Sequence, residues 1–248
     1  MPSATRTALV TGGMGGLGEA IARALHDAGH KVLVTHARDE GSARAWLTAE
    51  KAKGYGFVSY DVNVADFKSC QRMAERILSD GHQVDILINN AGITRDATLR
   101  KLDKENWDAV LRVNLDSVFN VTKPLLDGMV ERGWGRIINI SSINGSKGQF
   151  GQTNYSAAKA GMHGFTKALA QEVAKKGVTV NTVSPGYLAT KMVTAVPQDV
   201  LAKIVAGVPV GRLGEPDEIA ALVAFIASDA AAFMTGSNVA MNGGQHMY

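Results

Sequence analysis

A tyrosine and a lysine lie four residues apart in the stretch NYSAAKAG at 154–161, with only small residues between them. Four residues is slightly more than one helical turn, so on a helix Tyr155 and Lys159 share a face. An unperturbed phenol has a pKa near 10. An ammonium about 5 Å away, at an effective dielectric of about 20, favours the phenolate by roughly 3 kcal/mol, or about 2 pKa units. The pair therefore predicts a general acid, and the alternative is a pair of exposed side chains on a surface helix.

Two other polar residues precede this pair. Ser142 follows the apolar run 136–141, and its hydroxyl can donate to a carbonyl oxygen and hold it. Tyr155 is predicted to donate a proton to that oxygen. Asn114 lies in RVNLDS. Taken singly, Ser142 and Asn114 are also explained as caps of helices or turns.

A glycine-rich turn, TGGMGGLG at 11–18, follows the apolar run 7–12 and leads into a helical pattern. Glycines at this spacing permit a tight turn and allow backbone N–H groups to approach a pyrophosphate at a helix N-terminus. Because the turn follows the first predicted strand and opens the first predicted helix, it predicts dinucleotide binding rather than a structural turn. The residues assigned to that contact are Gly12, Met14, Gly15, Gly16, Leu17 and Gly18.

The end of the second apolar run indicates which dinucleotide is bound. A cofactor with a free ribose 2′-hydroxyl usually meets an acid there, whereas this run continues as VTHARDEG. We therefore predict that Ala37, Arg38 and Ser42 contact the 2′-phosphate of NADP(H).

Two later strand ends complete the predicted cofactor contacts. Asp61, Val62 and Asn63 are assigned to the adenine, and Asn90, Ala91, Gly92, Ile93 and Thr94 to the ribose.

Seven short apolar runs alternate with helical patterns along the chain. The runs cover 7–12, 31–36, 56–62, 84–92, 136–141, 178–186 and 238–244. They are continuous rather than alternating, as is typical of strands that are buried on both faces of a parallel sheet. The chain therefore predicts an α/β fold, a single-domain, Rossmann-type doubly wound parallel sheet of about seven strands with helices on both faces.

Composition excludes several classes of protein. The 248 residues carry a net charge of +3 spread along the chain, which argues against nucleic acid as a partner. No apolar run approaches the length of a membrane span, and the N-terminal residues lack the apolar core of a signal peptide. The single cysteine, Cys70, cannot form an internal disulfide. We expect a cytoplasmic protein without a metal site.

The segment 187–216 lies between the last two predicted strands and has no clear strand pattern, so we expect it to form a lid over the site. The PG turn at 185–186 can pass under a nicotinamide, and Pro185, Gly186 and Leu188 are assigned to that contact. The side chains assigned to the wall of the substrate pocket are Asp96, Gln149, Phe150, Gln152 and Tyr187, together with Gly186.

These motifs, in this order along almost the whole chain, resemble those of the short-chain dehydrogenase/reductase family. The resemblance is carried by TGGMGGLG, NNAG, Asn114, Ser142, the Tyr155 and Lys159 pair, and the PG turn. It implies that Lys159 also bonds the nicotinamide ribose and that Asn114 holds a water linking Lys159 to solvent. It further implies a homotetramer.

Longer stretches, such as KGQFGQTNYS, resemble the members of the family that reduce acetoacetyl-CoA in polyhydroxybutyrate synthesis. This resemblance implies that a 3-oxoacyl-CoA is converted with NADPH into an (R)-3-hydroxyacyl-CoA. Two alternatives stay open: a 3-oxoacyl-carrier-protein reductase of fatty acid synthesis, and a non-catalytic cofactor-binding regulator. A regulator is expected to lose Tyr155 or Lys159, and both are present.

Overall fold

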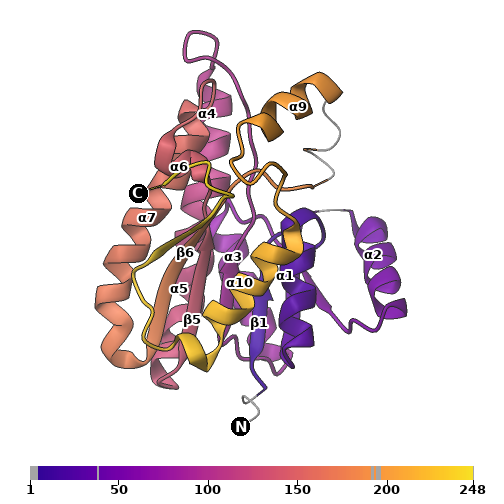
Figure 1. The fold of residues 1–248 in the computed structure, drawn as a ribbon. Coiled ribbons are helices and arrows are strands. Elements are labelled where there is room, and N and C mark those ends of the chain that lie inside the picture. The colour runs from indigo at the N-terminus through magenta and orange to yellow at the C-terminus, as the bar shows by residue number, and fades with distance from the viewer. Residues whose placement is uncertain (1–4, 38, 191–192, 194–196, 248) are drawn as a thin grey trace.

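A computed structural model describes residues 5–37, 39–190, 193 and 197–247 (Figure 1). The seven predicted strands are all present in these residues. The strands are β1 (Thr7–Val10), β2 (Lys31–His36), β3 (Val58–Asp61), β4 (Ile86–Asn89), β5 (Gly135–Ile140), β6 (Val178–Pro185) and β7 (Asn238–Met241). Each lies within one residue of, or inside, the apolar run that predicted it.

Helices connect the strands. They are α1 (Gly16–Asp27), α2 (Glu40–Ala52), α3 (Phe67–Ser79), α4 (Lys104–Leu111), α5 (Ser117–Glu131), α6 (Ile143–Lys147), α7 (Thr153–Val173), α9 (Gln198–Ala206) and α10 (Pro216–Ala227). A short π-helix, η1 (Arg112–Asp116), joins α4 to α5, and the 3-10 turns η2 (Ala174–Lys176) and η3 (Asp229–Ala231) follow α7 and α10. None of the described helices is both long and apolar enough to cross a lipid bilayer.

In the described part of the chain the strands form one sheet in the order β3-β2-β1-β4-β5-β6-β7, and every pair is parallel. The order reverses direction between β1 and β4. Ligands of doubly wound sheets bind outside the carboxyl ends of the strands at such a reversal. The fold class predicted from the apolar runs is confirmed, and the topology directs attention to the loops after β1 and β4.

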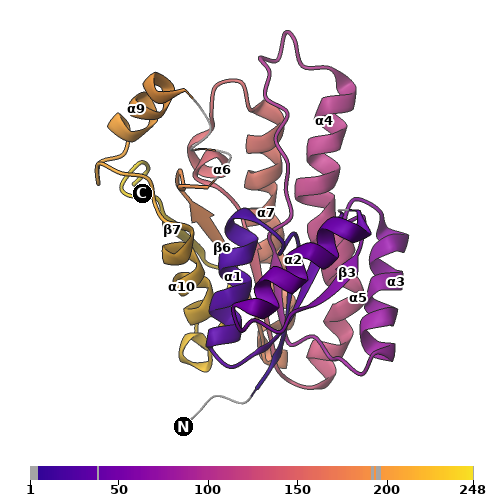
Figure 2. The ribbon, with the colours of Figure 1, turned by 90° about the vertical axis from the view of Figure 1, so that its right-hand side faces the viewer.

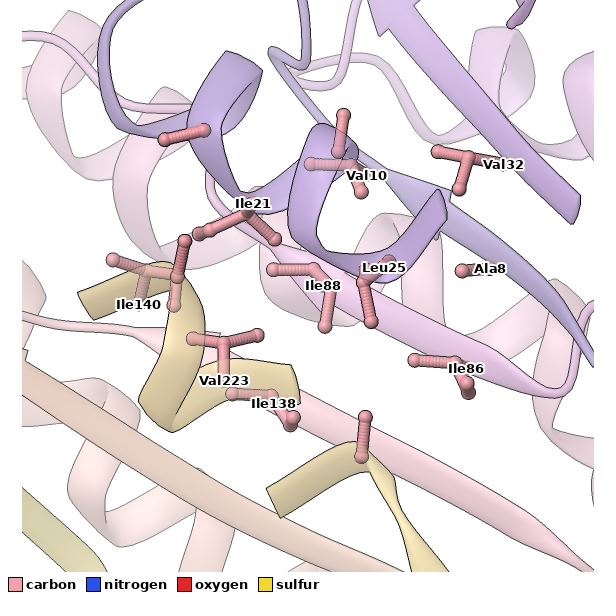
Figure 3. Close-up of a cluster of buried hydrophobic side chains, with 14 of the residues drawn as sticks. Ala8, Val10, Ile21, Leu25, Val32, Ile86, Ile88, Ile138, Ile140 and Val223 are labelled. Atoms are coloured by element: carbon pink, nitrogen blue, oxygen red, sulfur yellow. The ribbon is translucent and has the colours of Figure 1, made fainter. Parts of the chain in front are cut away.

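One face of the sheet packs against α1, α2 and α10 (Figure 2). Side chains alternate along β1, so Ala8 and Val10 point to this face while Leu9 points to the other. Figure 3 shows Ile21 and Leu25 of α1 against these strands, beside Val223 of α10. Burial of one such large aliphatic side chain stabilises the fold by about 1.5–3 kcal/mol.

The opposite face packs against α3, α5 and α7. Met73 and Ile77 of α3 and Met129 of α5 are buried there, as is the free thiol of Cys70. Burial raises the pKa of that thiol to about 11, so Cys70 is a packing residue rather than a nucleophile. Because helices cover both faces, the strands have no polar side to present to water, which explains their continuous apolar pattern.

The segment 187–216 contains α9 and returns to the sheet beside the end of β6. Leu188 forms a β-bridge with Gly214, and the N–H of Gly214 donates to the carbonyl of Tyr187 at 3.0 Å. In both views α9 lies above the carboxyl ends of the strands (Figures 1 and 2). Part of the predicted lid falls outside the described residues, and its closure stays a prediction.

Candidate active site

The Tyr155 and Lys159 pair lies on α7, as the four-residue spacing predicts, and the pair is not a surface one. The Lys159 side chain is 3% exposed, and its Nζ lies 5.6 Å from the centre of the Tyr155 ring. Lys159 Nζ donates a hydrogen bond of 2.7 Å to the carbonyl of Ile140, at the end of β5. Burial of an ammonium is costly unless it has partners, so a chance surface pair does not account for this arrangement.

The two pKa values move in directions set mainly by burial. Desolvation lowers the pKa of Lys159 to about 7. For Tyr155, desolvation raises the pKa to about 12; a hydrogen bond with Ser142 opposes that rise, and the charge of Asp96 adds to it. The lowered phenol pKa expected from the sequence is therefore wrong for this structure. Desolvation of the phenol outweighs the hydrogen bond with Ser142, which is the cause that lowers its pKa.

Ser142 lies where β5 passes into α6, and it reaches Tyr155. Its Oγ accepts from the N–H of Asn144 at 3.1 Å and so caps α6. The hydroxyl also forms the hydrogen bond that opposes the rise of the Tyr155 pKa. The cap interpretation and the catalytic interpretation of Ser142 are thus compatible, because the cap uses an acceptor lone pair and leaves the O–H able to donate.

Asn114 occupies the π-helical turn η1 and is fully buried. Its Nδ2 donates to the carbonyls of Ile93, at 2.8 Å, and Val110, at 2.9 Å, and its Oδ1 accepts from the N–H of Ile93 at 3.2 Å. A Cβ on Gly92 would lie only 2.5 Å from Asn114 Oδ1. The asparagine therefore fixes the loop after β4, and glycine at 92 is required for that close approach.

A chain of hydrogen bonds joins the loop after β4, the residue before α7 and helix α6. Gln152 Nε2 donates to Asp96 at 2.7 Å, and Gln152 Oε1 accepts from Asn144 Nδ2 at 2.9 Å. An ionised carboxylate only accepts, so Asp96 sets the orientation of both amides. Of the side chains assigned to the substrate wall, Asp96 and Gln152 are therefore brought together and engaged with each other.

The other predicted wall residues are more dispersed. Phe150 is 87% exposed, so it forms no buried wall. Gln149 accepts a hydrogen bond of 2.9 Å from Lys147. Tyr187 is half-buried, and its N–H donates to Gln245 at 3.2 Å. Its assignment to the substrate wall stays a prediction.

A cavity of about 590 Å³ opens at the sheet reversal, outside the ends of β1 and β4. It collects most of the residues assigned to the cofactor: Gly12, Met14, Gly15, Gly16, Leu17, Ala37, Val62, Asn90, Ala91, Gly92 and Ile93. Sequence reasoning did not assign Thr35, His36, Val64, Val113 and Thr190, which also line it. Thr35, His36 and Val64 lie at or near strand ends, and that position in the sequence could have identified them.

The walls of this cavity fit a dinucleotide. Helix α1 starts at the cavity with no side-chain cap, so its first N–H groups can meet a pyrophosphate. A Cβ on Gly18 would lie 2.3 Å from the carbonyl of Gly12, so only glycine lets the helix pack this closely on the turn. The lining combines this polar backbone with apolar side chains, including Val62.

Several assigned cofactor residues lie elsewhere. Ser42 is held by Asp39, which accepts from its N–H at 2.9 Å and its hydroxyl at 2.7 Å and caps α2. Asn63 turns its Oδ1 to the N–H of Ala65. Asp61, Thr94, Pro185, Gly186, Leu188, Tyr155 and Lys159 do not line the 590 Å³ cavity, and Arg38 lies outside the described residues.

Gly186 and Leu188 line an adjacent cavity of about 210 Å³ instead. Pro185 is the last residue of β6, whose partner strand is β7.

No cluster of three or more His, Cys, Asp or Glu side chains suited to a metal ion occurs within the residues described.

Comparison with known proteins agrees with this geometry. A family model described as enoyl-(acyl carrier protein) reductase matches residues 12–246. The acetoacetyl-CoA reductase of Cupriavidus necator is 57% identical over 242 residues, which cover 98% of each chain. The acetoacetyl-CoA reductase of Allochromatium vinosum is 52% identical over 244 residues, covering 98% of this chain and 99% of the relative. The 3-oxoacyl-[acyl-carrier-protein] reductase FabG of Escherichia coli is 46% identical over 242 residues, covering 98% of each chain.

These matches run from the glycine-rich turn to the C-terminal segment, so they include the cavity and the Tyr155 region alike. Together with the seven-stranded parallel sheet of the described residues, they assign the whole chain to one family. The chain belongs to the short-chain dehydrogenase/reductase family, oxidoreductases that use a nicotinamide cofactor.

Proposed function

We propose that this chain reduces 3-oxoacyl-CoA thioesters, acetoacetyl-CoA in particular, to (R)-3-hydroxyacyl-CoA with NADPH, in polyhydroxyalkanoate synthesis. The names of the relatives from Cupriavidus and Allochromatium support the substrate. The observation that carries the proposal is the buried Lys159 beside the half-buried Tyr155, with Ser142 bonded to the phenol. The (R) configuration rests on the resemblance to relatives.

When bound, the nicotinamide cofactor supplies the hydride for the ketone carbon. Tyr155 holds a proton at its Oη and gives it to the ketone oxygen as negative charge develops there. The hydroxyl of Ser142 donates a hydrogen bond to the same oxygen and stabilises that charge. Lys159 keeps its ammonium near the phenol and compensates the phenolate that the transfer leaves behind.

The raised pKa of Tyr155, about 12, bears on its role as a proton donor. A phenol with that pKa keeps its proton at neutral pH, and the alkoxide formed from a ketone is more basic than a phenolate, so the proton passes readily to it. Oxidation of an alcohol needs the phenolate as base, and burial disfavours the phenolate.

Different residues would hold the different parts of the cofactor. The N–H groups at the start of α1, around Gly16 and Leu17, suit the pyrophosphate. Ala37 and Val62 suit the adenosine, and the loop that begins at Asn90 suits the nicotinamide ribose together with Lys159. The hydrogen bonds of Asn114 to Ile93 support a positioning role for that asparagine, in addition to the water link implied by relatives.

A carrier-protein thioester is the second candidate substrate, because FabG of Escherichia coli matches the chain at 46% identity. The two candidates are separated by following NADPH oxidation with acetoacetyl-CoA and with an acetoacetyl carrier protein. We expect the higher kcat/KM with acetoacetyl-CoA. A preference for the carrier protein would favour the second function, and no turnover of either would remove both.

We expect kcat/KM to be higher with NADPH than with NADH. The end of β2 presents His36 and Ala37 to the cavity, and neither side chain supplies the carboxylate that a free ribose 2′-hydroxyl usually meets. Steady-state kinetics with each cofactor at saturating acetoacetyl-CoA measures the ratio. An equal or higher value with NADH would show that the phosphate assignment is wrong.

Replacement of Gln152 or Tyr187 by alanine should lower kcat/KM for acetoacetyl-CoA several-fold or more. Gln152 links Asp96 to Asn144, and Tyr187 follows the PG turn at the end of β6, so we expect both changes to disturb the substrate side of the site. A lost hydrogen bond costs about 0.5–1.5 kcal/mol, and more where a buried group is left unpaired.

Direct titration should give an almost unchanged Kd for NADPH in both variants. Gln171→Ala is the matched control, because Gln171 is exposed on α7, the helix that Gln152 precedes, and its side chain bonds only the carbonyl of Lys167 among the described residues. Wild-type kcat/KM in both variants would place the substrate wall elsewhere. Equal loss of NADPH affinity would make these residues part of the cofactor site.

We also propose that the chain is one domain in which residues 187–216 form a substrate lid, and that four copies assemble in the cytoplasm. The position of α9 above the strand ends supports the lid. Resemblance to relatives supports the tetramer, and the single cysteine supports the reducing compartment.

A further inference from the structure

A second hollow lies on the substrate side of the molecule, between the end of α6 and α9. It has a volume of about 330 Å³ and is lined by Lys147, Tyr187, Val200, Lys203, Ile204, Gly207 and Gln245. We call it the α6–α9 groove. It does not belong to the dinucleotide cavity, since none of these residues lines that cavity.

The groove continues from the site of the proposed reaction. Tyr187 lines the groove two residues beyond the end of β6, and Ser142 lies two residues beyond the end of β5, the neighbouring parallel strand. The N–H of Tyr187 donates to Gln245 at 3.2 Å, which ties the C-terminal segment to the wall of the groove. A chain leaving the ketone at Tyr155 therefore has a path that begins at Tyr187.

The groove is positively charged at its rim. Lys147 ends α6 and Lys203 lies in the last turn of α9, and both are exposed. Among the described residues that line the groove, none carries a carboxylate. Neither lysine is ion-paired with an acid in the part of the chain that the structure describes. Lys147 Nζ donates one hydrogen bond of 2.9 Å to Gln149 Oε1, and its ammonium has two further N–H donors.

The rest of the lining is of a different kind. Val200 and Ile204 present an aliphatic wall from α9, and Gln245 presents an amide. A ligand that fits these surfaces has an uncharged, amide-bearing arm next to the reacting group and phosphates at its far end. The phosphorylated pantetheine arm of an acyl thioester has this order of groups.

We propose that the α6–α9 groove binds the phosphorylated pantetheine arm of the substrate, with Lys147 and Lys203 on its phosphates. The inference rests on the proposed function, because it takes the ketone to react at Tyr155. It adds a recognition site for the part of the substrate that does not react. Binding energy from such a remote part is available to orient the ketone.

The test uses charge reversal and a truncated substrate. We compare the wild type with Lys147→Glu, Lys203→Glu and the double variant, on acetoacetyl-CoA and on S-acetoacetyl-N-acetylcysteamine, which lacks phosphates. For acetoacetyl-CoA we expect kcat/KM to fall several-fold in each single variant and at least tenfold in the double variant. For the short thioester, kcat/KM should change less than twofold in all of them, and the Kd for NADPH should be unchanged.

Lys175→Glu is the matched control, because Lys175 is exposed in η2 after α7 and changes the net charge equally. An acetoacetyl carrier protein forms a third arm. A lower kcat/KM of the Lys147 and Lys203 variants with either phosphorylated substrate supports the proposal. The substrate whose kcat/KM falls further identifies the source of the arm. The proposal is overturned by equal losses on the short thioester, or by no loss on either phosphorylated substrate. Failure of the wild type to turn over any thioester would instead overturn the proposed function.

Discussion

Replacement of Tyr155 by phenylalanine is expected to lower kcat by about 10²- to 10⁴-fold, the usual contribution of a positioned general acid. The phenol is the proposed proton donor, and burial keeps it protonated, with a pKa of about 12. Phenylalanine preserves the ring and its packing on α7 but removes the proton and the hydrogen bond with Ser142. The affinity for NADPH should therefore be nearly unchanged, since only an interaction of the transition state is lost.

Stopped-flow or steady-state measurement of kcat, with fluorescence titration of NADPH, checks this result. Tyr55→Phe is the control: Tyr55 lies after α2 and places its hydroxyl 3.5 Å from Asp27, far from the reaction. Turnover of Tyr155→Phe near the wild-type rate would remove this tyrosine from the mechanism. Parallel loss of NADPH affinity would assign it a cofactor role instead.

Replacement of Lys159 by methionine is expected to reduce kcat/KM at least 100-fold and to weaken NADPH binding about 10- to 100-fold, as for the loss of charged hydrogen bonds. Methionine keeps most of the buried volume, so the loss reports the ammonium. Lys159 lies beside Tyr155 and donates to Ile140, and we propose that it also bonds the cofactor ribose. An exposed pair would contribute about 0–1 kcal/mol, and its loss would be nearly silent.

The pH dependence of kcat/KM gives a second test of the role of Lys159. Burial lowers the pKa of its ammonium to about 7, so the charged form is lost as the pH rises through that value. If the ammonium is needed, kcat/KM for reduction falls on the alkaline side of pH 7. The methionine variant should lack this limb of the profile.

The same group makes stability depend on pH. Between about pH 7 and 10.5 the unfolded chain holds a proton on Lys159 that the folded chain does not, so this residue makes the free energy of unfolding rise with pH. The slope is at most about 1.4 kcal/mol per pH unit for one proton. The methionine variant should be the more stable protein at pH 7, and the difference should shrink by pH 9.

Urea unfolding at several pH values, with pH–rate profiles, measures both effects. Lys167→Met is the control, because Lys167 is exposed two turns further along α7. If Lys159→Met has the wild-type kcat/KM, NADPH affinity and pH profile, the proposed mechanism fails. An equal response of the two variants to pH would show that burial of Lys159 is not the cause.

The strands and the glycine-rich turn were predictable because their causes are local. A buried parallel strand needs a short apolar run, as in Thr7–Val10 and Ile86–Asn89, and a run of that kind is visible in any window of the sequence. The helix stop before Gly29 is equally local, since that residue has φ +89°, a conformation that glycine adopts without strain.

The candidate site was predictable in its membership but not in its electrostatics. The spacing of Tyr155 and Lys159 determines that they share a face of a helix, and the helix is present. It says nothing of how far packing removes each of the two side chains from water, and that desolvation is the largest cause of both pKa shifts. The direction of the Tyr155 pKa shift predicted from the sequence was therefore wrong, because desolvation depends on every segment packed around a group.

By itself, the sequence determined the strands, the helices between them, the glycine-rich turn and the order of the polar residues that end the strands. Only the tertiary structure decided that Gln152 bonds Asp96 and Asn144, that Asn114 holds the backbone of Ile93, and that Phe150 is exposed. The physical reason is one of range. Periodicity and turn chemistry act between near neighbours, whereas hydrogen-bond partners and burial depend on segments brought together by the sheet.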